Sequence, residues 1–468
     1  MLRFFCSESA GFSFDRGCNL RHGNDSFVFI GGFHGFLADE EALKTIFDYK
    51  GHAGNVPCQS CLNIRNRWCT IDDNPTLQYM WDPDLSKRKP TTDKHIEAVV
   101  NRLSDPAVGN TRRQDMQTKS GINYNSDGLL FDAYLMRNIL KPTQNYVRDW
   151  MHTLVSNGVA GSHLAQLCAA LSTVGCTMEI VQRYASLWAM AHGRVSTDLY
   201  FKSELISTDH VKHFASDQLG MIPIMYAFLH EKILPLGVLD KNIECWTLLW
   251  KIMCVLRRGD MNDTICQTLR SLIVQHNTLC LELYGNAHFK VKFHHLYHLP
   301  DDMFWLNKII SCFVTERKNK DAIAVSVTTD RALEKSATIS FLNRTIKHWS
   351  NNLEATQESY LLKPRAIMLH GQWVDHSTSA VLPCGELHQR QMVALRNGDI
   401  GAIVDFWQDA AYKQITVQIE VHMCIPNEQI YFELEPSSVV FVSSHAINEP
   451  ISWYATTTKL VASMPMYE

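Results

Sequence analysis

The hydrophobic and polar positions change their spacing along the chain. The apolar run 27–30 leads through Gly31 and Gly32 to Asp39, a pattern that predicts a strand that stops at Asp39. Residues 41–49 then have the pattern of a short helix. A polar region rich in turn signals follows, and helices are predicted within and after it, over 95–103 and 129–140.

From residue 150 to about 284 the apolar residues recur at spacings of three and four, which is typical of helices. The individual helices are predicted over 178–190, 211–234, 243–256 and 261–283. The aromatic and methionine residues of this region are expected to form a core.

The C-terminal part has a period of two. Strands are predicted over 391–395, 400–407, 415–421 and 439–442, and Asn397-Gly398-Asp399 indicates a hairpin turn. The pattern predicts a small all-β, barrel-like module without a catalytic motif. We expect it to be an interaction module, for DNA or chromatin.

Composition narrows the class of protein. The chain has 468 residues, of which 46% are hydrophobic and 20% charged, as in a globular protein of two or three domains. Its 14 cysteines show no disulfide framework, which favours a reducing compartment. The most apolar segment, 220–239, is interrupted by three polar or charged residues, so no membrane association is expected. The net charge of −4 argues mildly against an extended nucleic-acid surface but allows a local groove.

Two motifs point to metal chemistry. Cys58-x-x-Cys61 is half of a zinc site, with Cys69 as a less specific third thiol nearby. His294 and His298 stand at i and i+4, on one helical face, although such a pair also occurs on plain helix surfaces. His295 is the rival of His294, since it stands at i and i+3 from His298.

A carboxylate stands at each end of this series. Asp39 precedes the Cys-x-x-Cys motif by 19 residues, and Glu316 follows His298 by 18 residues. A carboxylate at the tip of a buried strand can hold a hard cation such as Mg²⁺, although a single aspartate after an apolar run is more often a turn residue.

The order carboxylate, Cys-x-x-Cys, His-x-x-x-His, carboxylate resembles the catalytic core of DDE transposases of the CACTA (EnSpm-like) group and of their relative, the RAG recombinase catalytic subunit. The resemblance implies that Cys58, Cys61, His294 and His298 bind one structural Zn²⁺. It also implies that Asp39 and Glu316 are the second and third catalytic acids, which hold Mg²⁺ or Mn²⁺ for in-line attack on a phosphodiester.

Other residues extend the resemblance. The chain reads Asp149-Trp150-Met151-His152, and an Asp-x-Met-His element also follows the Cys-x-x-Cys motif in plant CACTA transposases. Asp149, with His152 beside it, is expected either to cap the helix that starts near Trp150 or to hydrogen-bond the metal-binding carboxylates. The basic residues after Glu316 either face a phosphate backbone or form a solvated surface; they are Arg317, Lys318 and Lys320.

The fold class implied is α+β, a partial ribonuclease H-like core interrupted by a large helical insertion. The expected segments are the first part of the core (1–145), the all-α insertion (146–285), the second part of the core (286–350), a linker (351–388) and the β module (389–468). The expected partners are DNA at transposon ends and further copies of the same chain in a homo-oligomer, and the expected location is the nucleus.

The first catalytic acid of the family lies on an earlier strand than the second. Only Asp15 and Asp25 precede Asp39, and both have turn-like surroundings. The resemblance therefore predicts an N-terminally truncated core that does not cut or join DNA. The alternatives are a catalytically dead, zinc-stabilised module that binds DNA or protein, and a zinc-free helical scaffold in which the cysteine and histidine pattern is a coincidence.

Overall fold

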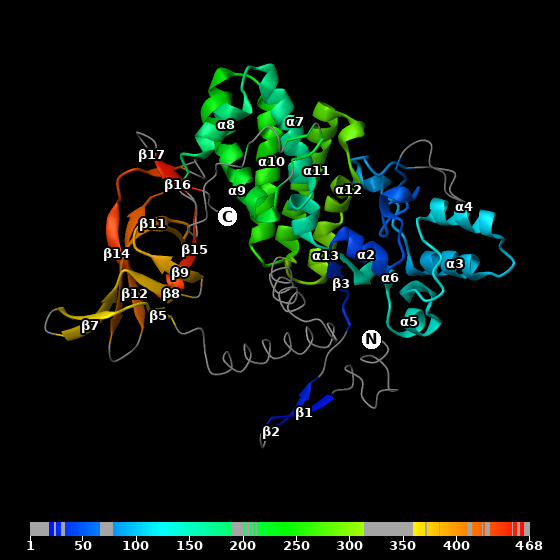
Figure 1. The fold of residues 1–468 in the computed structure, drawn as a ribbon, viewed down its shortest axis with the longest axis horizontal. Helices are drawn as coiled ribbons and strands as arrows, with labels where there is room; N and C mark the ends of the chain where they lie inside the picture. The colour runs from blue at the N-terminus through cyan, green and yellow to red at the C-terminus, as the bar shows by residue number, and fades with distance from the viewer. Residues whose placement is uncertain are drawn as a thin grey trace, which may run out of the picture. The chain divides into compact units, whose positions relative to one another are not determined.

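The computed structural model divides the chain into two compact units (Figure 1). The first unit comprises Met1–Gln166, Asp209–Val211 and Gly259–Cys312, and the second comprises Leu167–Thr208, Lys212–Arg258 and Phe313–Glu468. The residues described are 18–22, 25–29, 33–65, 78–188, 201, 206–207, 209–211, 213–312, 359–369, 372–382, 384–409, 414–423, 425, 431–451, 453–455 and 459–462.

The first unit contains two pairs of strands. β1 (Cys18–His22) and β2 (Asp25–Phe29) form an antiparallel hairpin. β3 (Phe36–Ala38) and β4 (Tyr146–Arg148) are parallel neighbours. The carboxyl ends of β3 and β4 therefore lie at the same edge.

A strand ends directly before Asp39, as the sequence predicts, but it is not the strand that contains the apolar run 27–30. Residues 27–29 of that run lie in β2, and a separate strand, β3, begins at Phe36. Helix α2 (Glu40–Ile46) begins after Asp39, whose side chain accepts a hydrogen bond from the Ala42 N–H. Asp39 is thus both the end of a strand and the N-cap of a helix.

Short helices cover this strand pair. They are α3 (Asp93–Ser104), α4 (Asn110–Ser120), α5 (Ala133–Asn138) and α6 (Pro142–Asn145), with 3₁₀ turns at Gly51–Ala53, Leu85–Lys87 and Leu129–Phe131. The helix predicted over 129–140 is divided at Asp132, because its side chain caps α5 by accepting from the Tyr134 and Leu135 N–H groups. Their shared core contains Leu43, Phe47, Ile96, Leu103, Leu130 and Tyr146.

The remaining elements of the first unit are helical. They are the π-helical turn Met151–Val155, the start of α7 (Val159–Thr173), α11 (Asp263–Tyr284), the 3₁₀ turn Asn286–His288, α12 (Val291–Leu296) and α13 (Leu299–Trp305). Helix α11, which falls within the expected insertion 146–285, belongs to the same compact unit as β3 and β4.

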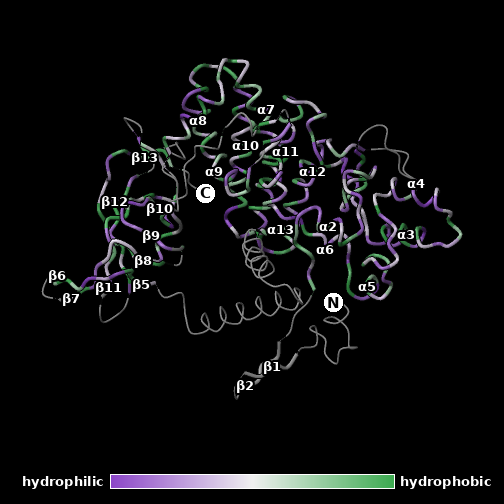
Figure 2. The backbone as a smooth tube through the Cα atoms, in the orientation of Figure 1, coloured by the Kyte–Doolittle hydropathy of each residue, from purple (hydrophilic) through white to green (hydrophobic). Residues whose placement is uncertain are grey.

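The second unit contains the helices that the apolar spacing predicts. They are α8 (Met178–Ala185), α9 (Ala215–Phe228), the π-helical and 3₁₀ turns Leu229–Ile233 and Leu234–Leu236, and α10 (Asp240–Arg257). The segment Ala215–Leu236 is long and apolar enough to cross a membrane by composition alone (Figure 2). Met221, Met225 and Phe228 are nonetheless fully buried, as in the core helix of a globular protein.

The second unit also contains the β module. Its strands are β5 (Tyr360–Leu361), β6 (Arg365–Leu369), β7 (Gln372–Ser377), β8 (Ser379–Leu382), β9 (Gly385–His388), β10 (Met392–Leu395), β11 (Ile400–Asp409), β12 (Ile415–His422), β13 (Tyr431–Glu433), β14 (Ser438–Ser443), β15 (Ile447–Pro450), β16 (Trp453–Ala455) and β17 (Lys459–Ala462).

The period-two pattern correctly predicts the longer of these strands. In β12, for example, Ile415, Val417 and Ile419 are buried and alternate with less buried residues. Across the part of the module that the structure describes, the strands form sheets of seven, three and three strands. None of these described sheets closes on itself, so the barrel-like form that the sequence suggested is replaced by open sheets.

Candidate metal centre

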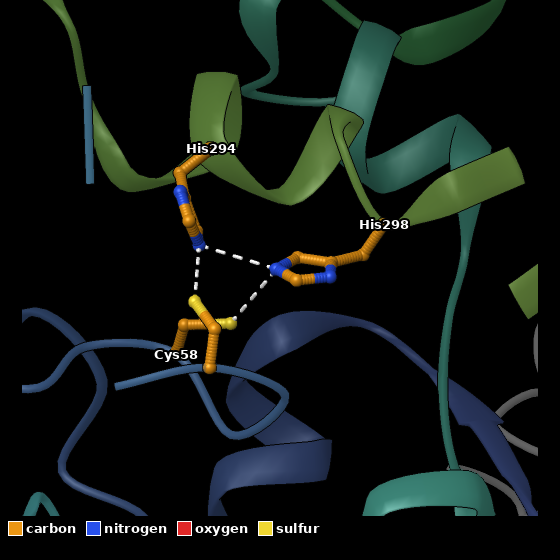
Figure 3. A group of neighbouring side chains, drawn as sticks. Cys58, His294 and His298 are labelled. Atoms are coloured by element: carbon orange, nitrogen blue, oxygen red, sulfur yellow. Dashed lines mark hydrogen bonds between the residues drawn. The ribbon is translucent and has the colours of Figure 1, made fainter. Parts of the chain in front are cut away.

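The structure brings the two cysteines and two histidines of the predicted zinc site together. The Cys58 Sγ atom lies 3.3 Å from His298 Nε2, and the Cys61 Sγ atom lies 3.0 Å from His294 Nε2. The two Nε2 atoms are 3.2 Å apart. Figure 3 shows Cys58, His294 and His298 pointing at one another from opposite sides of a small gap.

These separations of 3.0–3.3 Å are at or slightly below the spacing expected around a single tetrahedral ion. Ligands bound to zinc at about 2.0–2.3 Å lie about 3.3–3.8 Å apart. All four side chains are buried, and their ligand atoms all lie within 4.8 Å of one another. The cluster could therefore hold a metal ion such as zinc, although 233 residues separate Cys61 from His294.

Local structure fixes both halves of this cluster. The loop that carries the cysteines is held by backbone hydrogen bonds from Leu62 N–H to Lys89 O and from Thr91 N–H to Ser60 O. On the other side, the His294 Nδ1–H donates to the Met80 carbonyl over 2.7 Å. This hydrogen bond leaves the Nε2 lone pair directed at the cluster, the arrangement usual for a metal-binding histidine.

His295 does not join the cluster. It is buried and instead lines a small hollow with Arg148, Asp149 and Lys292. The spacing i and i+4 therefore identifies the converging pair, His294 and His298, and the i, i+3 alternative is set aside.

The pKa values of the two thiols are shifted in opposite directions. Burial raises the pKa of Cys58, but a hydrogen bond with Cys61 and the nearby His298, His294 and Arg148 outweigh it, and the pKa lies well below its ordinary value. Burial and the neighbouring Cys58 together raise the pKa of Cys61 well above its ordinary value. Two adjacent buried thiols ionise together only beside a cation, so these surroundings suit a metal ion.

Arg148 connects the cluster to the strand pair. Its guanidinium is buried, donates to Asp302 Oδ2 over 2.9 Å and to Ser60 Oγ over 2.6 Å, and lies 3.6 Å from Cys58 Sγ. The carboxylate of Asp302 and the sulfur of Cys58 both contact the positively charged guanidinium of Arg148. The motif analysis did not single out Arg148 or Asp302.

The edge of the strand pair presents two carboxylates. Ala38 and Arg148 are paired across β3 and β4, and Asp39 and Asp149 are the residues that directly follow these two paired strands. The amine of Lys292 lies near this edge. Burial lowers its pKa, whereas the charges of Glu40, Asp39 and Asp149 raise it.

Asp149 is held firmly, as the capping interpretation predicts. Its carboxylate accepts from the N–H groups of Met151, His152 and Cys312, and His152 Nδ1 lies 2.5 Å from its Oδ2. The sequence analysis missed its position beside Asp39, because β4 has only three residues. The sequence did contain a signal for this second strand. A short apolar stretch, Tyr146-Val147, precedes Asp149, just as the apolar stretch Phe36-Leu37-Ala38 precedes Asp39.

Several predicted residues lie outside the described part of the chain. They are Glu316, Arg317, Lys318, Lys320, Cys69 and Asp15. Asp25 belongs to β2, of which only the backbone is described.

No protein-family model and no curated protein sequence matches this chain.

Proposed function

We propose that the chain is a transposase-derived DNA-processing protein of the DDE type, whose zinc cluster joins two distant parts of its core. The observation that carries this proposal is the convergence of Cys58, Cys61, His294 and His298. The resemblance of the motif order to CACTA transposases implies that convergence, and the motif order places an acidic residue on each side of it.

The pairing of β3 with β4 changes which residues we propose as the catalytic acids. The sequence analysis sought the missing first acid before Asp39, at Asp15 or Asp25. Asp39 and Asp149 each directly follow one of two paired parallel strands, and ligands bind at the carboxyl ends of parallel strands in open sheets. We therefore assign Asp39 and Asp149 as the paired acids, with Glu316 as the third.

The residues at this edge fit a hard divalent cation. Three of the four hydrogen bonds to the Asp149 carboxylate come from backbone N–H groups, which hold it in place. The fourth comes from the His152 ring. Divalent ions bound there would activate the attacking oxygen and stabilise the leaving one.

The first test is nicking of supercoiled plasmid DNA by the full chain with Mn²⁺. We expect nicking that falls by at least about 100-fold in Asp39→Ser and in Asp149→Asn, because each removes one metal-binding charge worth several kcal/mol in the transition state. Serine keeps the N-cap of α2, and asparagine keeps an acceptor for the capping N–H groups.

The matched control for this test is Asp132→Ser. Asp132 caps α5 in the same manner as Asp39 caps α2, but it does not follow a strand. This variant should nick at the wild-type rate. Nicking that survives both Asp39→Ser and Asp149→Asn would contradict the assigned acids.

The second candidate function is a zinc-stabilised module that binds DNA or protein without catalysis. The observation in its favour is that both carboxylates already have structural roles, Asp39 as a helix cap and Asp149 in four hydrogen bonds. A wild-type chain that retains zinc but does not nick DNA would support this second function.

A further inference from the structure

We propose that the first unit contains a second metal site, for zinc or a similar ion, built by His163 of α7 and by His276 and Cys280 of α11. These side chains are at most 4% exposed. They belong to a group whose ligand atoms all lie within 4.8 Å of one another. None of the sequence motifs predicted this site.

The distances fit ligands of one ion. His276 Nε2 lies 3.2 Å from His163 Nδ1 and 3.5 Å from Cys280 Sγ. Around a tetrahedral zinc, two ring nitrogens lie about 3.3 Å apart, and a nitrogen and a sulfur lie about 3.6 Å apart. The geometry is thus the same as in the cluster of Cys58, Cys61, His294 and His298.

Hydrogen bonds through Asn277 fix the orientation of the His276 ring. The Asn277 side-chain amide donates to the Phe293 carbonyl over 3.0 Å, which turns its oxygen towards His276. The His276 Nδ1–H donates to this oxygen over 3.1 Å. The Nε2 lone pair therefore faces His163 and Cys280, just as the hydrogen bond to Met80 directs His294 in the first cluster.

Hydrogen bonding alone explains this arrangement less well than a metal ion. A ring nitrogen has one lone pair and accepts one strong hydrogen bond, yet His163 Nδ1 and Cys280 Sγ both approach His276 Nε2. Burial also favours neutral imidazoles, the form that binds metals. An ion would satisfy all three donor atoms at once.

A metal ion here would join two helices of the first unit. His163 lies on α7, which follows the π-helical turn after Asp149, and His276 and Cys280 lie on α11, which precedes α12 and His294. The ion would tie residues 113 positions apart within the first unit. Its role is structural, since it closes a long loop between two helices that frame the first cluster.

Metal analysis of the purified full chain tests the proposal. We expect about two zinc ions per wild-type chain and one fewer in Cys280→Ser, with the helical circular dichroism retained. The matched control is Cys266→Ser, which changes a buried cysteine of the same helix whose Sγ contacts the Pro300 carbonyl rather than a histidine. This control should keep the wild-type zinc content.

A Cys280→Ser chain that folds and keeps the wild-type zinc content would overturn the proposal. If that variant does not fold, cobalt titration of the metal-free wild-type chain decides instead. Tetrahedral absorption and sulfur-to-cobalt charge transfer should grow up to two equivalents. Saturation at one equivalent overturns the second site.

Discussion

Replacing Cys61 with serine will remove one zinc ion per chain and lower the thermal midpoint by about 10 °C or more. A structural zinc site contributes its binding energy to folding, and loss of such a site belongs to the few mechanisms that cost more than about 4 kcal/mol. For a compact unit of 150–250 residues, such as the first unit, each kcal/mol lowers the midpoint by about 2–4 °C. Metal analysis and a thermal scan by circular dichroism measure the two effects.

The control for this prediction is Cys168→Ser. Cys168 is equally buried, and burial raises its pKa to about 12, so it remains a protonated thiol that packs in the core. This variant should keep its zinc and lose about 1–2 kcal/mol, as expected when a buried apolar group becomes a hydroxyl. Equal midpoints for Cys61→Ser and Cys168→Ser would show that the first cluster does not hold a stabilising ion.

The spacing of cysteines and histidines made the first cluster predictable. Cys58 and Cys61 stand at the spacing of a metal half-site, and His294 and His298 share a helical face. The second group has the same i, i+4 signal in His276 and Cys280. It escaped notice because His163 lies on another helix and follows no motif.

The strand edge was only half predictable. Asp39 follows an apolar stretch and ends a strand, as expected, whereas β4 is too short to show a period. Whether two strands are neighbours depends on tertiary packing, which a local pattern does not contain. Helix α4 was also missed, because its sequence is almost wholly polar and only Met116 is buried.

The long amphipathic elements were the easiest to predict. Helix α11 buries one face, α10 is buried around most of its circumference, and β12 alternates between buried and less buried residues. The number and pairing of the C-terminal strands were harder to predict than their positions. A period of two fixes which face of a strand is buried, but it does not fix whether a sheet closes.

Replacing Arg148 with methionine will lower the free energy of unfolding by about 3–5 kcal/mol. Arg148 is buried, and Asp302 opposite it is only slightly exposed, so the variant leaves a carboxylate with no cation beside it. Ser60 loses its hydrogen bond as well, and Cys58 loses a neighbouring positive charge. Urea denaturation gives the free energy, and competition with a chelator gives the zinc affinity, which we expect to fall by about 10–100-fold.

Two further variants separate the buried pair from a general effect of lost charge. Lys119→Met breaks an exposed ion pair with Asp115 and should cost at most about 0.5 kcal/mol. The double variant Arg148→Met with Asp302→Leu removes both buried charges. It should be more stable than Arg148→Met alone, because most of the single variant's cost is the stranded carboxylate rather than the lost attraction. If the double variant is instead less stable by the full sum of the two single changes, Arg148 and Asp302 are not energetically coupled and the buried pair does not hold β4 to α13.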